Sequence, residues 1–429
     1  MEIIFIAIFL ATLFLLIGIN HKAFFLIVVS SIFLEHEFFW IKESEQIPFN
    51  LRPVYIATFI SLLYLIPQFF LKLKKGISLK LHHKMLLSYF FYCFITLLRN
   101  PNNHSVEHFG QLSIGILLYF SFIFLSKKDH FIDIFNTLLL VGFFQLLIGL
   151  FQLIAGVLTV ENIVNFSNLI QHADLVPYGR PFGTLVEPDF YGAINTFFAF
   201  IFIGEFYKSS YRIHYFAGLV NILFLMYSAV RASIIGFGIS FFVLLFHFRN
   251  QIKISTIDSL LFFYSALFSI PLFYTTIIRF SYFFRSDFWI EGFNNPRVLQ
   301  MSVSFSQFLE NPIFGNGLNA YRFLGDRYTN IIEDWMPNWV ISGYDPSIIT
   351  SLLNDTGIIG FSLFTLFIYI YLKSIISRNL EQNIFVFCAI LSLLISYIFT
   401  NGLPFAFTWV MLAIIEMYST NELLKNNEL

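Results

Sequence analysis

The sequence predicts an all-α, polytopic integral membrane protein with about 12–13 transmembrane helices and one large external loop. Hydrophobic residues make up 57% of the 429 residues and charged residues only 12%, whereas soluble domains carry roughly 25% charged residues. Apolar runs of about 20 residues, the length that crosses a bilayer, recur along the chain. A formal net charge of −1 provides no basic excess for DNA or RNA, so the expected surroundings are the lipid bilayer and no nucleic acid.

The apolar runs divide the chain into membrane regions and external loops. The N-terminal region, 1–157, contains candidate spans at 2–19, 23–40, 53–71, 85–98, 109–126 and 132–157. An external loop at 158–188 precedes the region 189–280, with spans at 189–206, 213–228, 231–248 and 256–276. A large external loop at 281–346 precedes the region 347–429, with spans at 348–372, 383–400 and 403–420. Cys93 and Cys388 lie in separate spans, so no metal site, cofactor or disulfide is expected.

Lysine sets the predicted orientation. Segment 72–84 carries five lysines, and positively charged loops stay on the cytoplasmic side. Alternation then places the loops 158–188 and 281–346 outside and the C-terminus inside. The net charge conceals an asymmetry, because the bases of the inner segments are mostly Lys and those of the outer segments almost all Arg.

External arginine indicates an anionic ligand. The planar guanidinium binds phosphate oxygens in pairs, whereas Lys acts as a point charge. The alternative is that these side chains extend to the membrane interface or pair with neighbouring acids. The external arginines are Arg52, Arg99, Arg180, Arg231, Arg279, Arg285, Arg297, Arg322 and Arg327.

The interior of the predicted bundle is poor in ionisable groups. Ion-coupled transporters keep acids or histidines deep in the membrane, and their scarcity here weakens a transporter interpretation. Gln145 and Gln152 share one face of their span. Interhelical hydrogen bonds are the favoured role for them, and lining a groove for a lipid headgroup is the alternative.

Three external patches combine charged side chains with turn residues. The first, 180–192, leads into a span, and the second is a tight turn at 227–233. The third joins an amphipathic stretch and the segment 311–321 to the segment 344–360. Within it, Gly315 and Gly317 predict a turn with positive φ rather than a nucleotide-binding loop.

In order and spacing, these patches resemble the O-antigen polymerase and O-antigen ligase superfamily of bacterial envelope glycan enzymes. The R-x-x-G segment followed by P-D matches 180–189, and the S-x-x-R turn matches 228–231. An Arg, an amphipathic helix and x-P-x-x-G-x-G match 297–317, and D-x-G-x-x-G matches 355–360. The resemblance covers roughly residues 130–400.

The resemblance implies a polymerase of lipid-linked oligosaccharide repeat units in the bacterial inner membrane. A metal-independent glycosyltransferase of this kind moves the growing glycan from undecaprenyl pyrophosphate to a new undecaprenyl-pyrophosphate-linked oligosaccharide. The reaction takes place at the outer face of the membrane, with the large loop in the periplasm and the C-terminus in the cytoplasm. A separate chain-length co-polymerase is an implied partner.

This reaction needs positive charge on the pyrophosphate and a base for the acceptor hydroxyl. The arginines predicted to bind the pyrophosphate are Arg180, Arg231 and Arg297, followed by Arg279 and Arg285. The predicted bases are Asp345, favoured by its position in the motif, and Glu187 and Asp189. Each acid has the alternative role of structural partner to a neighbouring Arg.

Two other functions remain open. A ligase would transfer finished polymer to a lipid A core or a protein. Ligases of the superfamily typically carry a His before the last motif, whereas this chain has no His after His247, which favours a polymerase. A glycolipid flippase or transporter, the candidate from another class, would show internal repeats and deep polar groups, and the sequence shows neither.

Overall fold

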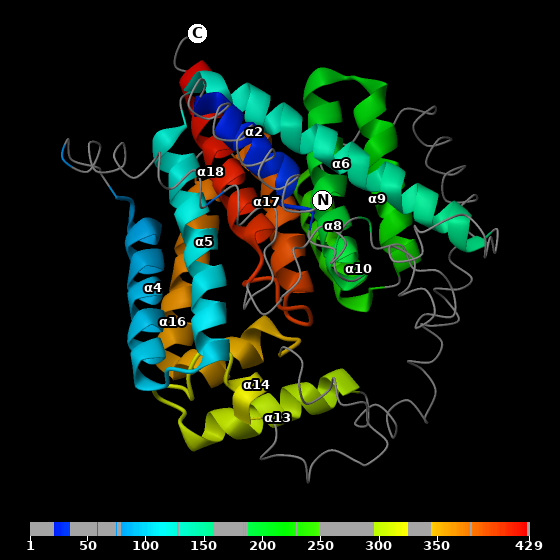
Figure 1. Cartoon of the computed structure of the whole chain (residues 1–429). Coiled ribbons are helices and arrows are strands. Elements are labelled where there is room, and N and C mark those ends of the chain that lie inside the picture. Colours follow the sequence, from blue (N-terminus) through cyan, green and yellow to red (C-terminus); the bar gives the residue numbers. More distant parts are fainter. Residues whose placement is uncertain are drawn as a thin grey trace, which may run out of the picture.

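The described part of the chain is a bundle of helices (Figure 1). The computed structural model describes residues 21–34, 58, 74, 79–126, 128–157, 183, 185, 188–228, 230–248, 296–324, 345–377 and 380–426. Within these ranges every regular element is a helix and there is no strand. The all-α class predicted from the sequence is therefore confirmed.

Six of the described helices are long and apolar enough to cross a membrane. They are α4 (Leu81–Arg99), α5 (Asn103–Leu125), α6 (Lys128–Val157), α8 (Pro188–Ser209), α10 (Arg231–Phe248) and α16 (Ile348–Ile376). The bundle also contains α2 (His21–Ser31), α9 (Arg212–Ser228), α17 (Leu380–Ser396) and α18 (Ala406–Asn426). This arrangement confirms a polytopic membrane protein.

Most of the predicted spans coincide with these helices to within a few residues. The spans predicted at 2–19 and 256–276 lie outside the described residues, as does that at 53–71 apart from Thr58. The span predicted at 23–40 is described as far as residue 34, and its helix ends at Ser31. The total number of spans therefore stays a prediction.

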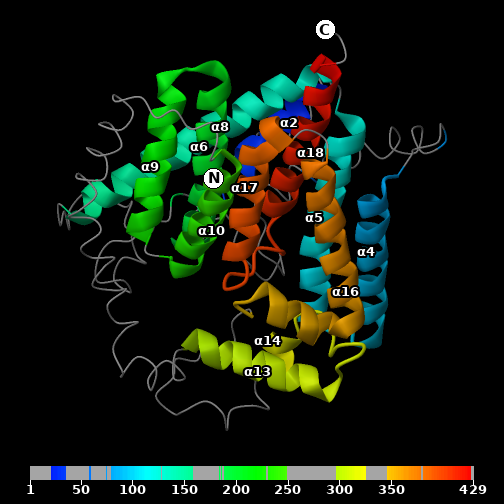
Figure 2. The same ribbon diagram turned by 180° about the vertical axis from the view of Figure 1, so that it is seen from behind.

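The two ends of the bundle differ in composition. The helices α13 (Pro296–Glu310) and α14 (Ala320–Leu324) lie across one end, which we call the α13 end (Figures 1 and 2). The turn between α8 and α9 and the end of α18 lie at the opposite end (Figure 1). We call this the lysine end, because Lys80, Lys208 and Lys373 lie there, at the first residues of α4 and the last turns of α8 and α16.

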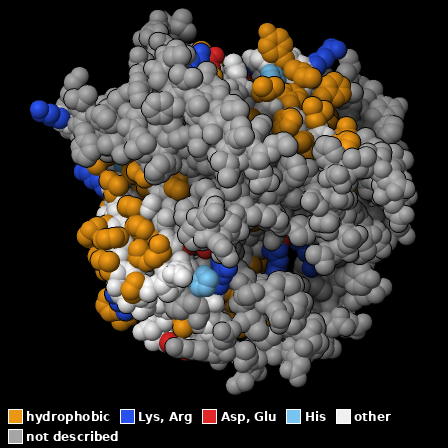
Figure 3. Space-filling view, viewed as in Figure 1, with side chains coloured by type: hydrophobic (Ala, Val, Ile, Leu, Met, Phe, Trp, Pro, Cys, Tyr) orange, Lys and Arg blue, Asp and Glu red, His pale blue; other side chains and the backbone are white. Residues whose placement is uncertain are grey.

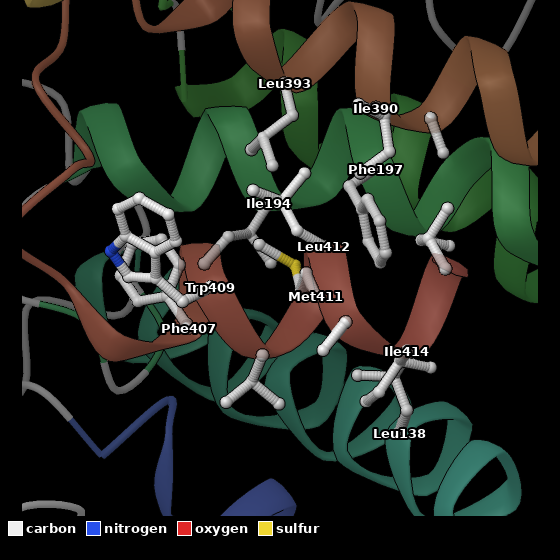
Figure 4. Close-up of a cluster of buried hydrophobic side chains, with 14 of the residues drawn as sticks. Leu138, Ile194, Phe197, Ile390, Leu393, Phe407, Trp409, Met411, Leu412 and Ile414 are labelled. Carbon is white, nitrogen blue, oxygen red and sulfur yellow. The ribbon is translucent and has the colours of Figure 1, made fainter. Parts of the chain in front are cut away.

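The apolar core is built around α18. Figure 4 shows the α18 side chains Met411 and Leu412 facing Ile194 and Phe197 of α8. The indole of Trp409 is fully buried and donates to the Leu403 carbonyl oxygen over 2.8 Å. Burial of such a side chain stabilises a fold by roughly 1.5–3 kcal/mol in water, but among lipid tails the gain comes from close packing and satisfied polar groups.

A glycine on α5 makes room for that indole. A Cβ added at Gly115 would lie 2.1 Å from Cδ1 of Trp409. No side chain fits at this separation, so α5 and α18 approach closely only because residue 115 is glycine. Small residues at helix contacts are a general feature of membrane bundles.

The outward faces of the helices are apolar. On α4, Phe91 is 62% exposed and Leu98 64% exposed. The space-filling view shows hydrophobic side chains gathered over α4 and α5 (Figure 3). An exposed apolar surface on helices of spanning length is expected to face lipid.

Candidate functional site

The helix α13 carries a buried polar stripe at the α13 end. Gln300, Ser304 and Gln307 are at most 4% exposed and occur at i, i+4 and i+7, which places them on one helix face. By contrast, Phe305 and Leu309 of the same helix are 47% and 60% exposed. The buried face of α13 therefore carries these polar side chains beside Val303 and Phe308, while Phe305 and Leu309 face outward, and the buried polar groups need partners in neighbouring segments.

Asp345 is one of those partners. It is 4% exposed and lies just before α16. The hydroxyl of Ser304 donates to its Oδ2, while the Thr350 hydroxyl and the Ser347 N–H donate to its Oδ1 over 2.6 and 2.9 Å. Burial raises the pKa of Asp345 to about 6, although these hydrogen bonds favour its ionised form. A carboxylate with such a pKa can act as a base near neutral pH.

Gln307 of the same stripe bonds two asparagines, Asn316 after Gly315 and Asn354 on α16. The Asn354 amide donates to Oε1 of Gln307, and the Asn316 amide donates to Oδ1 of Asn354 over 3.0 Å. Nε2 of Gln307 is buried without a hydrogen-bond partner in the structure. This cluster joins α13 to the segment 311–319 and to α16.

The glycines of the x-P-x-x-G-x-G and D-x-G-x-x-G segments hold each other in place through their backbones. A Cβ on Gly315 would lie 2.5 Å from the carbonyl oxygen of Asp355, and a Cβ on Gly357 would lie 2.4 Å from that of Ile313. The N–H of Gly317 donates to the same Asp355 oxygen over 3.2 Å. The three glycines have φ values of 76°, 119° and 65° in chain order, which confirms the positive φ predicted at Gly315 and Gly317.

Gly357 also interrupts α16. Its backbone is non-helical, with ψ −170°, so the first turns of α16 are set off from the long segment that follows. The carboxylate of Asp355, four residues after Ser351, accepts from the Ala320 N–H over 2.9 Å and from the Ser351 hydroxyl over 3.3 Å. Asp355 thereby fixes the start of α14 rather than facing a ligand.

Two of the predicted site residues form an ion pair. The guanidinium of Arg297, at the start of α13, contacts Oδ2 of Asp189 in the first turn of α8, and its Nη1 donates to the Phe399 carbonyl oxygen over 2.8 Å. The Arg297 side chain is nonetheless 41% exposed, against 13% for Asp189. The pairing supports the structural role for Asp189, while part of the guanidinium still faces outward.

The ion pair and Asp345 lie close to one turn of chain after α17. Arg297 bonds the Phe399 oxygen, and the N–H of Ile348, three residues after Asp345, donates to the Tyr397 carbonyl oxygen over 3.1 Å. Along α13, seven residues separate Arg297 from the Ser304 that bonds Asp345, which corresponds to about 10 Å. A basic and an acidic candidate therefore lie about two helical turns apart.

Arg231 belongs to the same end of the bundle. It is the first residue of α10 and follows the turn that contains Ser228 and Val230. A Cβ added at Gly192 of α8 would lie 2.8 Å from the Ser228 hydroxyl and from Val230. Gly192 is one turn beyond Asp189, so the Arg231 turn packs on α8 beside the Arg297–Asp189 pair.

Gly183, the glycine of the R-x-x-G segment, is held in place by the side-chain amide of Gln152 on α6. Gly183 is buried with φ 61°, and it exchanges two hydrogen bonds with the Gln152 side chain, at 2.7 and 2.9 Å. A Cβ on Gly183 would lie 2.3 Å from Oε1 of Gln145. The sequence predicted interhelical hydrogen bonds for these glutamines, whereas the partner of Gln152 is the loop backbone.

Four of the predicted residues cannot be placed. Arg180, Glu187, Arg279 and Arg285 lie outside the described residues. Asp345, Asp189, Arg297 and Arg231 are described, and all four lie at the α13 end.

Two contributors to the site were not predicted from the sequence: Ser304, which donates to Asp345, and Gln307. Their spacing with Gln300 on an amphipathic helix could have revealed a buried polar stripe. Glu416 and the adjacent His82 and His83 form a cluster at the lysine end that no local pattern predicts, because the residues are more than 330 positions apart.

No protein-family model matches the chain, and no curated protein matches it.

Proposed function

We propose that the protein is a polymerase of lipid-linked oligosaccharide repeat units. It would transfer a growing glycan from undecaprenyl pyrophosphate to a new repeat unit at the outer face of a bacterial inner membrane. The observation that carries the proposal is the position of the exposed, basic Arg297 at the start of α13 and of the buried, acidic Asp345, which accepts a hydrogen bond from Ser304 of the same helix. Arg297 and the Ser304 that bonds Asp345 are about two helical turns apart on α13, which puts charge for a pyrophosphate and a base at the same end of the bundle.

The proposed reaction forms one bond and breaks one. The acceptor hydroxyl oxygen attacks the anomeric carbon of the donor glycan, the bond between that carbon and the pyrophosphate oxygen breaks, and the hydroxyl proton passes to Asp345. The pyrophosphate leaves with its negative charge, which Arg297 and Arg231 would stabilise. A carboxyl whose pKa is about 6 is largely ionised at pH 7, so it can accept the proton.

Purified protein supplied with lipid-linked repeat units tests the proposal. We expect wild-type protein to produce a ladder of glycans and Arg297→Ala to produce none while it stays in the membrane. Arg297→Lys should rescue poorly, because one ammonium cannot replace a bidentate guanidinium. Arg322→Ala is the control, because this arginine pairs with Glu107 at 3.6 Å and has no proposed role.

Asp189→Asn separates phosphate binding from a structural ion pair. If Arg297 only holds α13 to α8, Asp189→Asn should lose as much activity as Arg297→Ala. If Arg297 binds pyrophosphate, Asp189→Asn should retain a ladder while Arg297→Ala does not. A full ladder from Arg297→Ala would contradict the proposal.

Transfer of finished polymer to lipid A core would indicate a ligase, and movement of lipid-linked glycan across a vesicle membrane without a new bond would indicate a transporter.

A further inference from the structure

A second polar cluster lies at the lysine end, away from α13. The carboxylate of Glu416 on α18 is 1% exposed. Its Oε2 accepts hydrogen bonds from Tyr119 of α5 and lies 3.1 and 3.2 Å from Nε2 of His82 and His83 on α4. Its Oε1 accepts from Lys80 over 2.6 Å.

The helix α4 separates this cluster from the candidate site. The Asn100 side chain, at the other end of α4, donates to the Asn316 carbonyl oxygen over 2.6 Å. The 17 residues from His83 to Asn100 span about 26 Å of helix. The cluster is therefore independent of the proposed transfer chemistry.

Its atoms are spaced like the ligands of a metal ion. Two atoms that each lie about 2.0–2.1 Å from a tetrahedral zinc ion are roughly 3.3 Å apart. The separations of 3.1 and 3.2 Å between Oε2 of Glu416 and the two Nε2 atoms are close to this value. The ligand atoms of His82, His83 and Glu416 all lie within 4.8 Å of one another, so an ion fits between them after small shifts.

We propose that His82, His83 and Glu416 bind a divalent transition-metal ion, with Zn²⁺ as the best match. Two imidazole nitrogens and one carboxylate oxygen are a donor set that zinc prefers. All three side chains are buried, so the ion would be shielded from solvent. The Tyr119 hydroxyl, hydrogen-bonded to the same carboxylate oxygen, supplies a fourth polar atom at this point. The bound ion would link α4 to α18 at the lysine end.

Lys80 would compete with the metal ion for the Glu416 carboxylate and thereby lower the metal affinity of the site. Its ammonium is bonded to Oε1 of Glu416, and its side chain is 39% exposed. A metal ion on Oε2 would place two cations, the ion and the Lys80 ammonium, beside one carboxylate, so Lys80 must turn outward as the ion binds. Removal of the ammonium should therefore tighten metal binding, whereas removal of a ligand should weaken it.

Cobalt titration of the full-length protein in detergent tests the site. After EDTA treatment, we expect wild-type protein to bind one Co²⁺ per chain with the visible absorption of tetrahedral cobalt, and Zn²⁺ to displace it. His82→Gln, His83→Gln and Glu416→Gln should each bind at least about 100-fold more weakly, and Lys80→Met about tenfold more tightly. His108→Gln is the matched control, because His108 is a buried histidine of α5 outside the cluster.

The wild-type titration decides the proposal even if a ligand variant fails to fold. Elution at the wild-type volume and an unchanged melting temperature identify folded variants. Folded wild-type protein without tetrahedral cobalt absorption would overturn the proposal and leave a metal-free cluster of hydrogen bonds around Glu416. Equal cobalt affinity in all three folded ligand variants would overturn it as well. Neither measurement depends on polymer formation, so a negative cobalt result would not bear on the proposed polymerase function.

Discussion

Asp345 is a buried carboxylate whose hydrogen-bond donors are uncharged groups. Its recorded donors are two hydroxyls and one backbone N–H, which favour the ionised form less strongly than a paired Arg would. Desolvation consequently outweighs the hydrogen bonds, and the pKa rises to about 6. Arg297 lies about two helical turns along α13 from the Ser304 that bonds Asp345, and its guanidinium pairs with Asp189.

The raised pKa predicts how activity depends on pH. Because the base must be ionised, we expect the polymerisation rate to fall about tenfold per pH unit below about pH 6 and to level off above it. Asp345→Asn should lose this dependence together with most of the activity. Initial rates of ladder formation by purified protein between about pH 5 and pH 8 measure the profile.

Ser304→Ala provides the positioning test. The Ser304 hydroxyl donates to the ionised carboxylate, so its removal should move the midpoint of the profile to higher pH. Ser302→Ala on the exposed face of α13 is the control, because the Ser302 hydroxyl bonds only its own helix, at Val298. An unchanged midpoint in Ser304→Ala would show that Asp345 is not the group that titrates.

At the scale of elements, the decisive contact is between the segment 311–319 and the break in α16. Backbone approaches this close require residues without a Cβ, and positive φ favours glycine as well. The N–H of Ile358 donates to the Pro312 carbonyl oxygen over 2.9 Å, just beyond the break at Gly357. The glycine motifs therefore form the backbone contact that holds α13 in place, and they contribute to the candidate site by positioning this helix.

We expect Gly315→Ala to destabilise the protein strongly. Its added Cβ would lie 2.5 Å from backbone atoms, and its φ is 76°, which together cost about 2 kcal/mol or more. Gly110→Ala on α5 is the matched control, because a Cβ there meets nothing within 4 Å, and Ala is the better helix former by up to about 1 kcal/mol. Thermal unfolding in detergent should show a clearly lower melting temperature only for Gly315→Ala.

At the scale of the whole molecule, the two polar clusters occupy opposite ends of the bundle. Between them, the described helices are packed by apolar side chains around α18 (Figure 4). The lysines gather at the end that holds Glu416, which is the side predicted to face the cytoplasm. The orientation decides whether the α13 end can meet a substrate outside the membrane.

Cysteine labelling tests this orientation. Asn103 at the start of α5 and Ser377 at the end of α16 are both exposed, at the α13 end and the lysine end respectively. A membrane-impermeant maleimide added to intact spheroplasts should label Asn103→Cys and leave Ser377→Cys unlabelled until the cells are permeabilised. The native Cys93 and Cys388 are buried, so they provide a low background. The reverse pattern would place the candidate site in the cytoplasm and contradict the proposed function.

The sequence by itself determined the fold class, most helix positions and the motif segments, because these depend on local hydropathy and on residues such as Gly and Pro. It also indicated Arg297, Asp189 and Asp345, but it could not show that the first two pair with each other while the third binds hydroxyl groups. Those partners come from different helices, and the pattern along one helix does not specify its neighbour.

Only the tertiary structure decided which polar groups meet. Ser304 became relevant because α13 packs onto α16, and Glu416 became a candidate metal ligand because α18 packs along α5 and its carboxylate reaches His82 and His83 of α4. A buried polar side chain must find a partner wherever packing places it. The pairing is therefore a property of the packed bundle rather than of any single segment.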